Sequence, residues 1–93
     1  MREKQIEQHL RKAVKEQGGL CLKFVSPGYD GVPDRIILMP NGKIAFAELK
    51  APGKKMRPLQ EARKRQLERL GFSVFLVDNT DGIGGLIDEI HTL

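Results

Sequence analysis

The stretch VPDRIILMPNGKIAFAELK, residues 32–50, predicts two β-strands joined by a tight turn. Its centre, Met39-Pro40-Asn41-Gly42-Lys43, places Pro at the second position of a type I turn and Gly where a left-handed residue follows. This pattern is typical of a three-residue hairpin loop, which pairs Met39 with Lys43. A two-residue Asn41-Gly42 turn is the alternative, and it slips the strand pairing by one residue.

The register of this hairpin decides where two acidic residues lie. The three-residue loop sets Asp34 opposite Glu48, whereas the two-residue loop turns Asp34 to the other face of the sheet. Directly opposed residues have Cβ atoms about 4.5–5.5 Å apart, so two carboxylates repel unless a positive group lies between them. A divalent cation is the simplest such group. Lys50, two residues after Glu48, should share its face, so the three side chains are expected to converge.

The length and charge of the chain limit the functions it can have. Its 93 residues predict one domain, 1–93, with one modest core and a site that is shallow or shared with a second subunit. The net charge is +4, and half of the sixteen basic residues fall between Lys50 and Arg69. A basic segment after an acidic site favours a polyanion such as DNA as partner, although a solvated helix face explains the same run.

Several features predict an unsecreted protein without a membrane partner. No apolar run is long enough to span a bilayer, and no charged-then-apolar leader begins the chain. The single cysteine, Cys21, permits no internal disulfide and is expected to be a small core residue. We therefore expect a cytoplasmic protein.

Apolar periodicity predicts the other elements. An amphipathic helix is expected from Arg2 to about Gln17, followed by a strand over 20–25 and a loop over 26–31. After the hairpin, a helix is expected over 58–70 and a buried strand over 72–77, which should run parallel to the strand of Glu48. Thr80 or Asp81 is expected to cap a last helix. The buried side of the 58–70 helix is predicted to comprise Met56, Leu59, Ala62, Gln66, Leu67 and Leu70. The order predicts an α/β fold with a small mixed sheet flanked by helices, α-β-β-β-α-β-α.

Three further residues have two interpretations each. Glu7, at the border of the first helix's apolar stripe, either pairs with Arg11 one turn on or faces the predicted cation site. Gln60, in the first turn of the second long helix, is either a hydrogen-bonding partner of the site or exposed. Tyr29 is either an ordinary turn residue or a residue that stacks on a base or sugar.

The residues Pro33-Asp34 and Glu48-Leu49-Lys50, in a hairpin between an acid-bearing helix and a basic helix, resemble the PD-(D/E)xK nuclease signature. The whole chain is similar to the virus-type replication-repair nuclease (VRR-NUC) domain in its stand-alone phage and bacterial form. The stretches that carry this resemblance are Gly31-Val32-Pro33-Asp34, Ala47-Glu48-Leu49-Lys50 and Gln60. The resemblance implies a restriction-endonuclease-like core.

The resemblance also implies roles for individual residues. The positions matching Asp34, Glu48 and the Leu49 backbone carbonyl hold Mg²⁺ or Mn²⁺ in the family, and Glu7 matches an acid that acts through a water on the cation. Lys50 matches the lysine that acts on the attacking water, and Gln60 matches a glutamine near the site. Oxygen ligands suit Mg²⁺ or Mn²⁺ rather than zinc, and His9 and His91 fall outside the cluster. Whether one or two cations take part is left open.

We therefore expect a metal-dependent, structure-selective DNA endonuclease without an organic cofactor. Stand-alone relatives in the family resemble Holliday-junction resolvases, so a homodimer acting on four-way junctions is the first expectation. Flap or linear DNA as substrate, or a non-catalytic DNA-binding adaptor, are the alternatives. The predicted DNA contacts are Tyr29, Lys54, Lys55, Arg57 and Lys64.

Overall fold

The computed structural model describes all 93 residues. A four-stranded sheet is built from β1 (Leu20–Lys23), β2 (Arg35–Met39), β3 (Lys43–Leu49) and β4 (Ser73–Val77), and the helices are α1 (Glu3–Glu16), α2 (Pro58–Arg69) and α3 (Ile83–His91). The strands lie in the order β1-β2-β3-β4, with β4 parallel to β3 and the other neighbours antiparallel. The predicted α/β fold and element order are confirmed. None of the three helices is long and apolar enough to cross a membrane.

The hairpin register is the one that the three-residue loop predicts. Met39 pairs with Lys43, and Ile36 pairs with Phe46. The prediction of a type I turn is wrong, because Asn41 has φ 68° and ψ 24° where that turn needs φ near −90°. Asn41 and Gly42, with φ 72°, are thus both left-handed. Asn and Gly tolerate this conformation best, so the turn closes with little strain.

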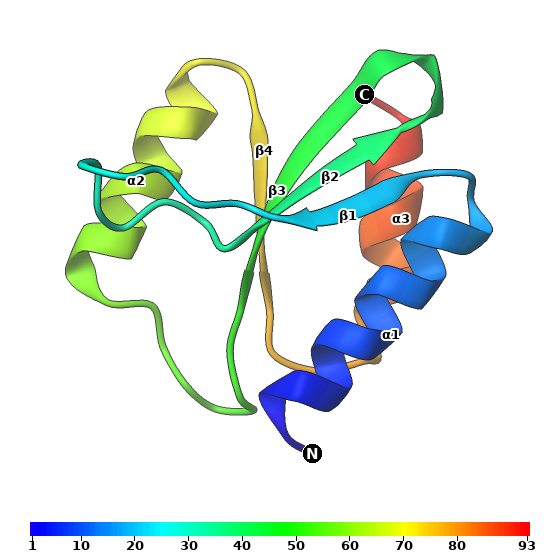
Figure 1. The fold of residues 1–93 in the computed structure, drawn as a ribbon, viewed down its shortest axis with the longest axis horizontal. Helices are drawn as coiled ribbons and strands as arrows, with labels where there is room; N and C mark the ends of the chain where they lie inside the picture. The colour runs from blue at the N-terminus through cyan, green and yellow to red at the C-terminus, as the bar shows by residue number, and fades with distance from the viewer.

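One face of the sheet carries the core, which α1 and α3 cover (Figure 1). Side chains alternate between the two faces of a strand, so Ile37, Ala45, Ala47, Leu49 and Val77 all point to this helix-covered face. They pack against a buried stripe on each of the two helices, formed by Ile6, Leu10 and Val14 of α1 and by Ile83, Leu86, Ile87 and Ile90 of α3. Apolar residues recur every three or four positions along both helices, which is the spacing that places them on one side of a helix.

The other face of the sheet is less well covered, and we call it the open face. It carries Leu20 and Leu22 of β1, Ile36 and Leu38 of β2, Ile44, Phe46 and Glu48 of β3, and Val74 and Leu76 of β4. The helix α2 packs against β4 at one side of this face (Figure 1). The prediction that β4 is buried on both faces is therefore wrong for Leu76, which is exposed.

Three local predictions also need correction. Leu59 of α2 and Leu70, which follows the helix, are exposed, and the only residue of this helix that is buried is Gln60. The first strand ends at Lys23 rather than Val25. The residue capping α3 is Gly82, whose N–H donates to Asn79 Oδ1, rather than Thr80 or Asp81. In each case tertiary packing or a local side chain outweighs the sequence pattern.

Candidate active site

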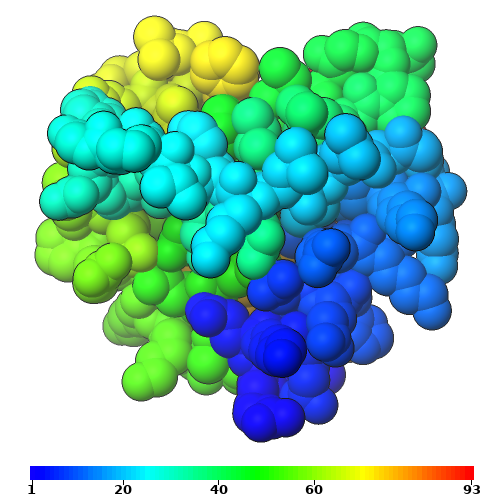
Figure 2. Space-filling model, viewed as in Figure 1, coloured from blue at the N-terminus to red at the C-terminus, as the bar shows by residue number.

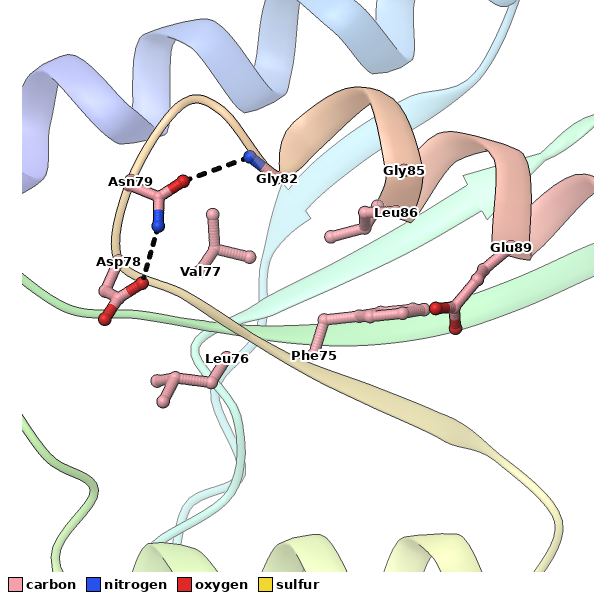
Figure 3. A pocket seen from close by; sticks show the side chains of 9 residues that line it. All are labelled: Phe75, Leu76, Val77, Asp78, Asn79, Gly82, Gly85, Leu86 and Glu89. Atoms are coloured by element: carbon pink, nitrogen blue, oxygen red, sulfur yellow. Dashed lines mark hydrogen bonds between the residues drawn. The ribbon is translucent and has the colours of Figure 1, made fainter.

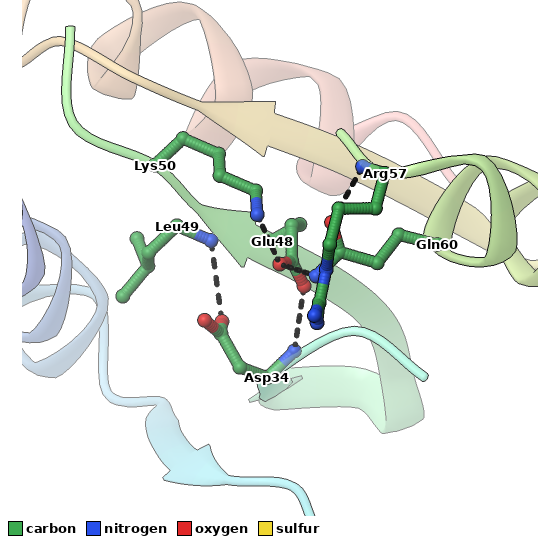
Figure 4. A network of polar contacts seen from close by, with 6 residues as sticks. All are labelled: Asp34, Glu48, Leu49, Lys50, Arg57 and Gln60. Carbon is green, nitrogen blue, oxygen red and sulfur yellow. Dashed lines mark hydrogen bonds and ion pairs between the residues drawn. The ribbon is translucent and has the colours of Figure 1, made fainter. Parts of the chain in front are cut away.

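The hairpin brings Asp34 and Glu48 together on the open face (Figure 4). Asp34 precedes β2 and Glu48 is the last but one residue of β3, so the register places them opposite each other. The Asp34 backbone N–H donates to Glu48 Oε1 at 3.2 Å, and the Leu49 N–H donates to Asp34 Oδ1 at 3.2 Å. The carboxylate of Glu48 is therefore held by the backbone at Asp34, and the carboxylate of Asp34 is held by the backbone next to Glu48.

Burial disfavours ionisation of both acids, and the charge of Glu48 adds to this effect on Asp34. The pKa of Asp34 is raised to about 6, first by burial and then by the charge of Glu48, while the Leu49 N–H and Arg35 oppose the shift. Burial likewise raises the pKa of Glu48, against the opposing charge of Lys50 and the hydrogen bond from Asp34. A cation placed between the acids would offset both effects. The donor chemistry, two carboxylates beside a strand end, therefore fits a hard divalent cation.

Lys50 and Gln60 complete the cluster around Glu48. Lys50 Nζ lies 3.5 Å from Glu48 Oε2, and Gln60 Nε2 donates to the same oxygen at 2.7 Å. The Gln60 side chain also accepts the Arg57 N–H at 2.9 Å, so it caps α2 and contacts the acid at once. Of the two interpretations of Gln60, the buried hydrogen-bonding one is correct.

Comparisons with known proteins agree with this geometry. A solved structure described as "VRR_NUC domain" superposes with a TM-score of 0.86 at 28% identity, covering 92% of this chain and 94% of that one. The chain is also 49% identical over 81 residues, 87% of each chain, to "Putative nuclease p44" of Acyrthosiphon pisum secondary endosymbiont phage 1. The chain belongs to the VRR-NUC family. It is therefore a nuclease. No family model matches the sequence.

The third acid expected of a VRR-NUC site, Glu7, lies in an ion-pair network of its own. Glu7 Oε2 is 3.0 Å from Arg35 Nη2, and Glu7 Oε1 is 3.7 Å from Arg11 Nη1. No group of three or more His, Cys, Asp or Glu side chains is arranged to hold a metal ion. Glu3, one turn earlier on α1, adds to the charges that raise the pKa of Asp34. The metal role of Glu7 remains a prediction.

The predicted DNA contacts of this VRR-NUC chain differ in their surroundings. Lys54, Lys55 and Arg57 are exposed in and after the segment that leaves β3, whereas Lys64 pairs with Glu68 at 2.9 Å. Tyr29 donates its hydroxyl to Gln66 Oε1 at 2.9 Å, and the guanidinium of Arg63 lies 3.8 Å from the centre of its ring.

The loop that carries Tyr29 is thereby fastened to α2. Arg63 also donates to the Asp30 carbonyl at 2.8 Å. A Cβ on Gly31 would lie 2.7 Å from Leu59 Cγ, so glycine permits this close approach. We did not single out Arg63 from the sequence, because the contact joins segments more than thirty residues apart and has no local signal.

Two of the hollows on the surface differ in their relation to the predicted site. One, of about 210 Å³, lies between β4 and α3 beside Phe75, Asp78 and Leu86, and none of the predicted site residues lines it (Figure 3). The other, of about 420 Å³, is lined by Arg57, Gln60 and the Asp30-Gly31 turn. The second hollow shares Gln60 with the carboxylate cluster, so it is the concave surface next to the site.

Proposed function

We propose that this VRR-NUC nuclease is a Mg²⁺- or Mn²⁺-dependent endodeoxyribonuclease that works as a homodimer on branched DNA, with four-way junctions preferred. The observation that carries the proposal is the reciprocal bonding of Asp34 and Glu48, two acids with raised pKa values beside Lys50. Such a pair is costly when both acids are ionised alone and is tolerated with a cation between them.

The proposed ligands are Asp34, Glu48 and the backbone carbonyl of Leu49, with Glu7 acting through a water. Carboxylate and carbonyl oxygens are hard donors of the kind that Mg²⁺ and Mn²⁺ prefer. A bound cation supplies Lewis-acid polarisation of the scissile phosphate and lowers the pKa of a water. Gln60 and two backbone N–H groups fix the carboxylates in place, which reduces reorganisation during the reaction.

Lys50 is the proposed residue for orienting the attacking water and offsetting negative charge on the phosphate. The water oxygen forms a bond to phosphorus, the bond from phosphorus to one ester oxygen breaks, and the departing oxygen takes up a proton. No covalent protein intermediate is required. The Nζ of Lys50 is held 3.5 Å from Glu48 Oε2, so its position depends on the same acid.

The proposed DNA path runs over the basic segment that follows Lys50. Lys54, Lys55 and Arg57 are free to neutralise phosphates, because they are exposed. Lys64 and Tyr29 lie on α2 and on the loop fastened to it, and they are proposed to border the path. Arg57 lines the hollow that also contains Gln60, which joins this path to the carboxylates.

Labelled four-way, flap and linear DNA, each incubated with Mg²⁺, Mn²⁺ or chelator, tests the proposal. We expect symmetric, metal-dependent nicks near the crossover of the four-way junction. Lys50→Ala should lower the rate by about 10²- to 10³-fold, as loss of other electrostatic stabilisers does. Lys12→Ala, which removes an exposed lysine of α1, is the matched control and should cleave at the parental rate. Binding without cutting under all conditions would favour an adaptor, and equal cutting of linear DNA would remove the junction preference.

A further inference from the structure

The loop between β1 and β2 begins with a tight turn that presents Tyr29. The Tyr29 N–H donates to the Ser26 carbonyl at 3.1 Å, which closes a four-residue turn. Pro27 occupies the second position of this turn, and Gly28 has φ 80° at the third, as a type II turn requires. The turn therefore fixes the backbone of Tyr29, and the chain then continues to Asp34, a proposed ligand.

The ring of Tyr29 is held against α2 and yet remains partly open to solvent. The Arg63 guanidinium lies 3.8 Å from the ring centre, and the Tyr29 hydroxyl donates to Gln66 Oε1 at 2.9 Å. Arg63 donates from Nη1 to the same oxygen at 3.3 Å and from Nε to the Asp30 carbonyl at 2.8 Å. Tyr29 is nevertheless 44% exposed. Because the guanidinium covers one face of the ring, this exposure belongs to the opposite face and the ring edge.

The loop lies at the surface of the molecule. In Figure 2 its cyan atoms cross in front of the yellow-green atoms of α2. An aromatic ring with one face covered by a cation and the other face open, fixed by a hydroxyl hydrogen bond, is a rigid platform for a second flat group.

We propose that Tyr29 stacks on a base that is exposed at a branch point, and that this contact makes the nuclease prefer branched DNA. The inference rests on the proposed function for the active site and the DNA path, and it assigns the branch preference to one residue. Every base has a π-face, so an aromatic side chain stacks on any base without reading its sequence. Inside a duplex, neighbouring bases already cover both faces of each base. A free base face exists only at a branch, a flap or a strand end.

The place of Tyr29 along α2 fits a base close to the cleaved phosphate. Gln60 donates to Glu48 of the carboxylate cluster, and Gln66, which accepts the Tyr29 hydroxyl, follows six residues later. At about 1.5 Å per residue, the two glutamines lie about 9 Å apart along the helix, which is the rise of roughly two to three stacked bases. The hollow of about 420 Å³ that Gln60 shares with Asp30 connects the loop to the cluster.

The basic residues near the site do not explain a preference for branched DNA. Lys54, Lys55 and Arg57 are suited to phosphates, which every DNA substrate carries, so they raise the affinity for branched and linear DNA alike. The Arg63 guanidinium is engaged with the ring and with the Asp30 carbonyl, so Arg63 is a positioning residue for Tyr29. Discrimination between a branch and a duplex needs a group that recognises a free base face, and the Tyr29 ring is such a group.

Tyrosine fluorescence tests the contact directly, because Tyr29 is the single tyrosine of a chain without tryptophan. The fluorescence lifetime is measured with chelator present, so that no DNA is cut. A four-way junction and single-stranded oligothymidine should shorten the lifetime through stacking. Relaxed circular duplex, an abasic oligonucleotide and heparin offer negative charge without a free base face, and they should leave the lifetime unchanged. An unchanged lifetime with the junction, or equal shortening by heparin or the abasic strand, would overturn the inference.

Substitutions measure what the ring contributes to substrate choice. Tyr29→Leu should lower the ratio of kcat/KM for a four-way junction to that for circular duplex at least about fivefold, because base–aromatic stacking is lost. Tyr29→Phe keeps the ring and loses the hydroxyl bond to Gln66, and it should retain most of this ratio. Val25→Ala, at a 67% exposed residue of the same segment, is the matched control and should retain the parental ratio. Circular dichroism verifies the fold of each variant.

Three results of the variant experiment would overturn the stacking role. They are a parental ratio in Tyr29→Leu, an equal loss in Val25→Ala, and an equal loss in Tyr29→Phe, which would assign the effect to the hydroxyl rather than to the ring. These outcomes are separate from those of the nuclease test. Metal-dependent cleavage by Tyr29→Leu at the parental ratio contradicts only the stacking role, whereas a parent that never cleaves DNA but shows junction-specific quenching contradicts only the proposed activity.

Discussion

The two faces of the sheet use the same strands for different purposes. On the helix-covered face, the odd-numbered residues of the hairpin, such as Ile37, Ala45 and Leu49, are buried among α1 and α3 and hold the fold together. On the open face, the even-numbered residues include Asp34, Glu48 and apolar side chains such as Ile44, which is 37% exposed. The comparison teaches that stability and function are separated here by the alternation of side chains along a strand.

The largest expected effect is the loss of activity caused by a substitution on the open face. Glu48→Gln should lower metal-dependent DNA cleavage by about 10²- to 10³-fold, because it removes a proposed ligand and leaves the shape of the side chain unchanged. Its stability should change little or rise in the absence of metal, since the charge that raises the pKa of Asp34 is removed. Cleavage assays and urea unfolding of the same preparation measure both. Glu16→Gln, at an exposed residue of α1, is the control, and a parental rate for Glu48→Gln would refute the site.

The next effect is a difference between the two faces in how much a substitution lowers the free energy of unfolding. Ile37→Ala should lower the free energy of unfolding by about 2–5 kcal/mol, because Ile37 is fully buried and its removal leaves a cavity. Ile36→Ala, one residue away on the open face, should cost less, because Ile36 is only partly buried. Urea unfolding of the two variants measures both costs. Equal costs would contradict the division between faces.

A smaller effect concerns pH in the metal-free protein. The pKa of Asp34 is about 6 in the folded protein, and its ordinary value, which applies to the unfolded chain, is 3.8. Between these two pH values the folded state therefore binds more protons than the unfolded state. The contribution of Asp34 to the free energy of unfolding is therefore fully present below about pH 4, and it is lost as the pH rises through about 6. Allowing for solvent screening of a half-buried group, the loss is on the order of 1 kcal/mol.

Urea unfolding from pH 4 to pH 7, with and without Mg²⁺, measures this pH effect. Asp34→Asn should remove the part of the pH dependence that belongs to Asp34. Added Mg²⁺ should stabilise the parent more at pH 7 than at pH 5, because the cation and the proton compete for the same carboxylates. An identical pH dependence in parent and Asp34→Asn would contradict the assignment.

The smallest effect concerns the turn that sets which residues belong to which face. Asn41→Ala should lower the free energy of unfolding by about 1 kcal/mol, since alanine tolerates φ 68° less well than asparagine does. Pro40→Ala, next to it, is the comparison at a residue outside the left-handed region. Thermal unfolding measures both changes, and a neutral Asn41→Ala would mean that the turn relaxes without cost.

Much of the site followed from the sequence because its parts are close along the chain. The turn between Asp34 and Glu48 favours one register over the alternative, and that register alone places the two acids and Lys50 on one face. The sequence does not decide whether Gln60 is buried, because its burial depends on how α2 returns to the sheet. Its hydrogen bond to Glu48 depends on the path of residues 50–57, which connect β3 to α2.

The sequence by itself determined the order of the elements and the buried stripes of α1 and α3, and it favoured the hairpin register that the structure has over the register slipped by one residue. Only the tertiary structure decided that Leu59 and Leu70 are exposed, that Glu7 pairs with Arg35, that Arg63 fastens the Tyr29 loop, and that one sheet face stays open. The physical reason is the distance along the chain over which each kind of interaction acts. Periodicity and turn chemistry act over a few neighbouring residues, whereas coverage and ion pairing depend on where distant segments are packed.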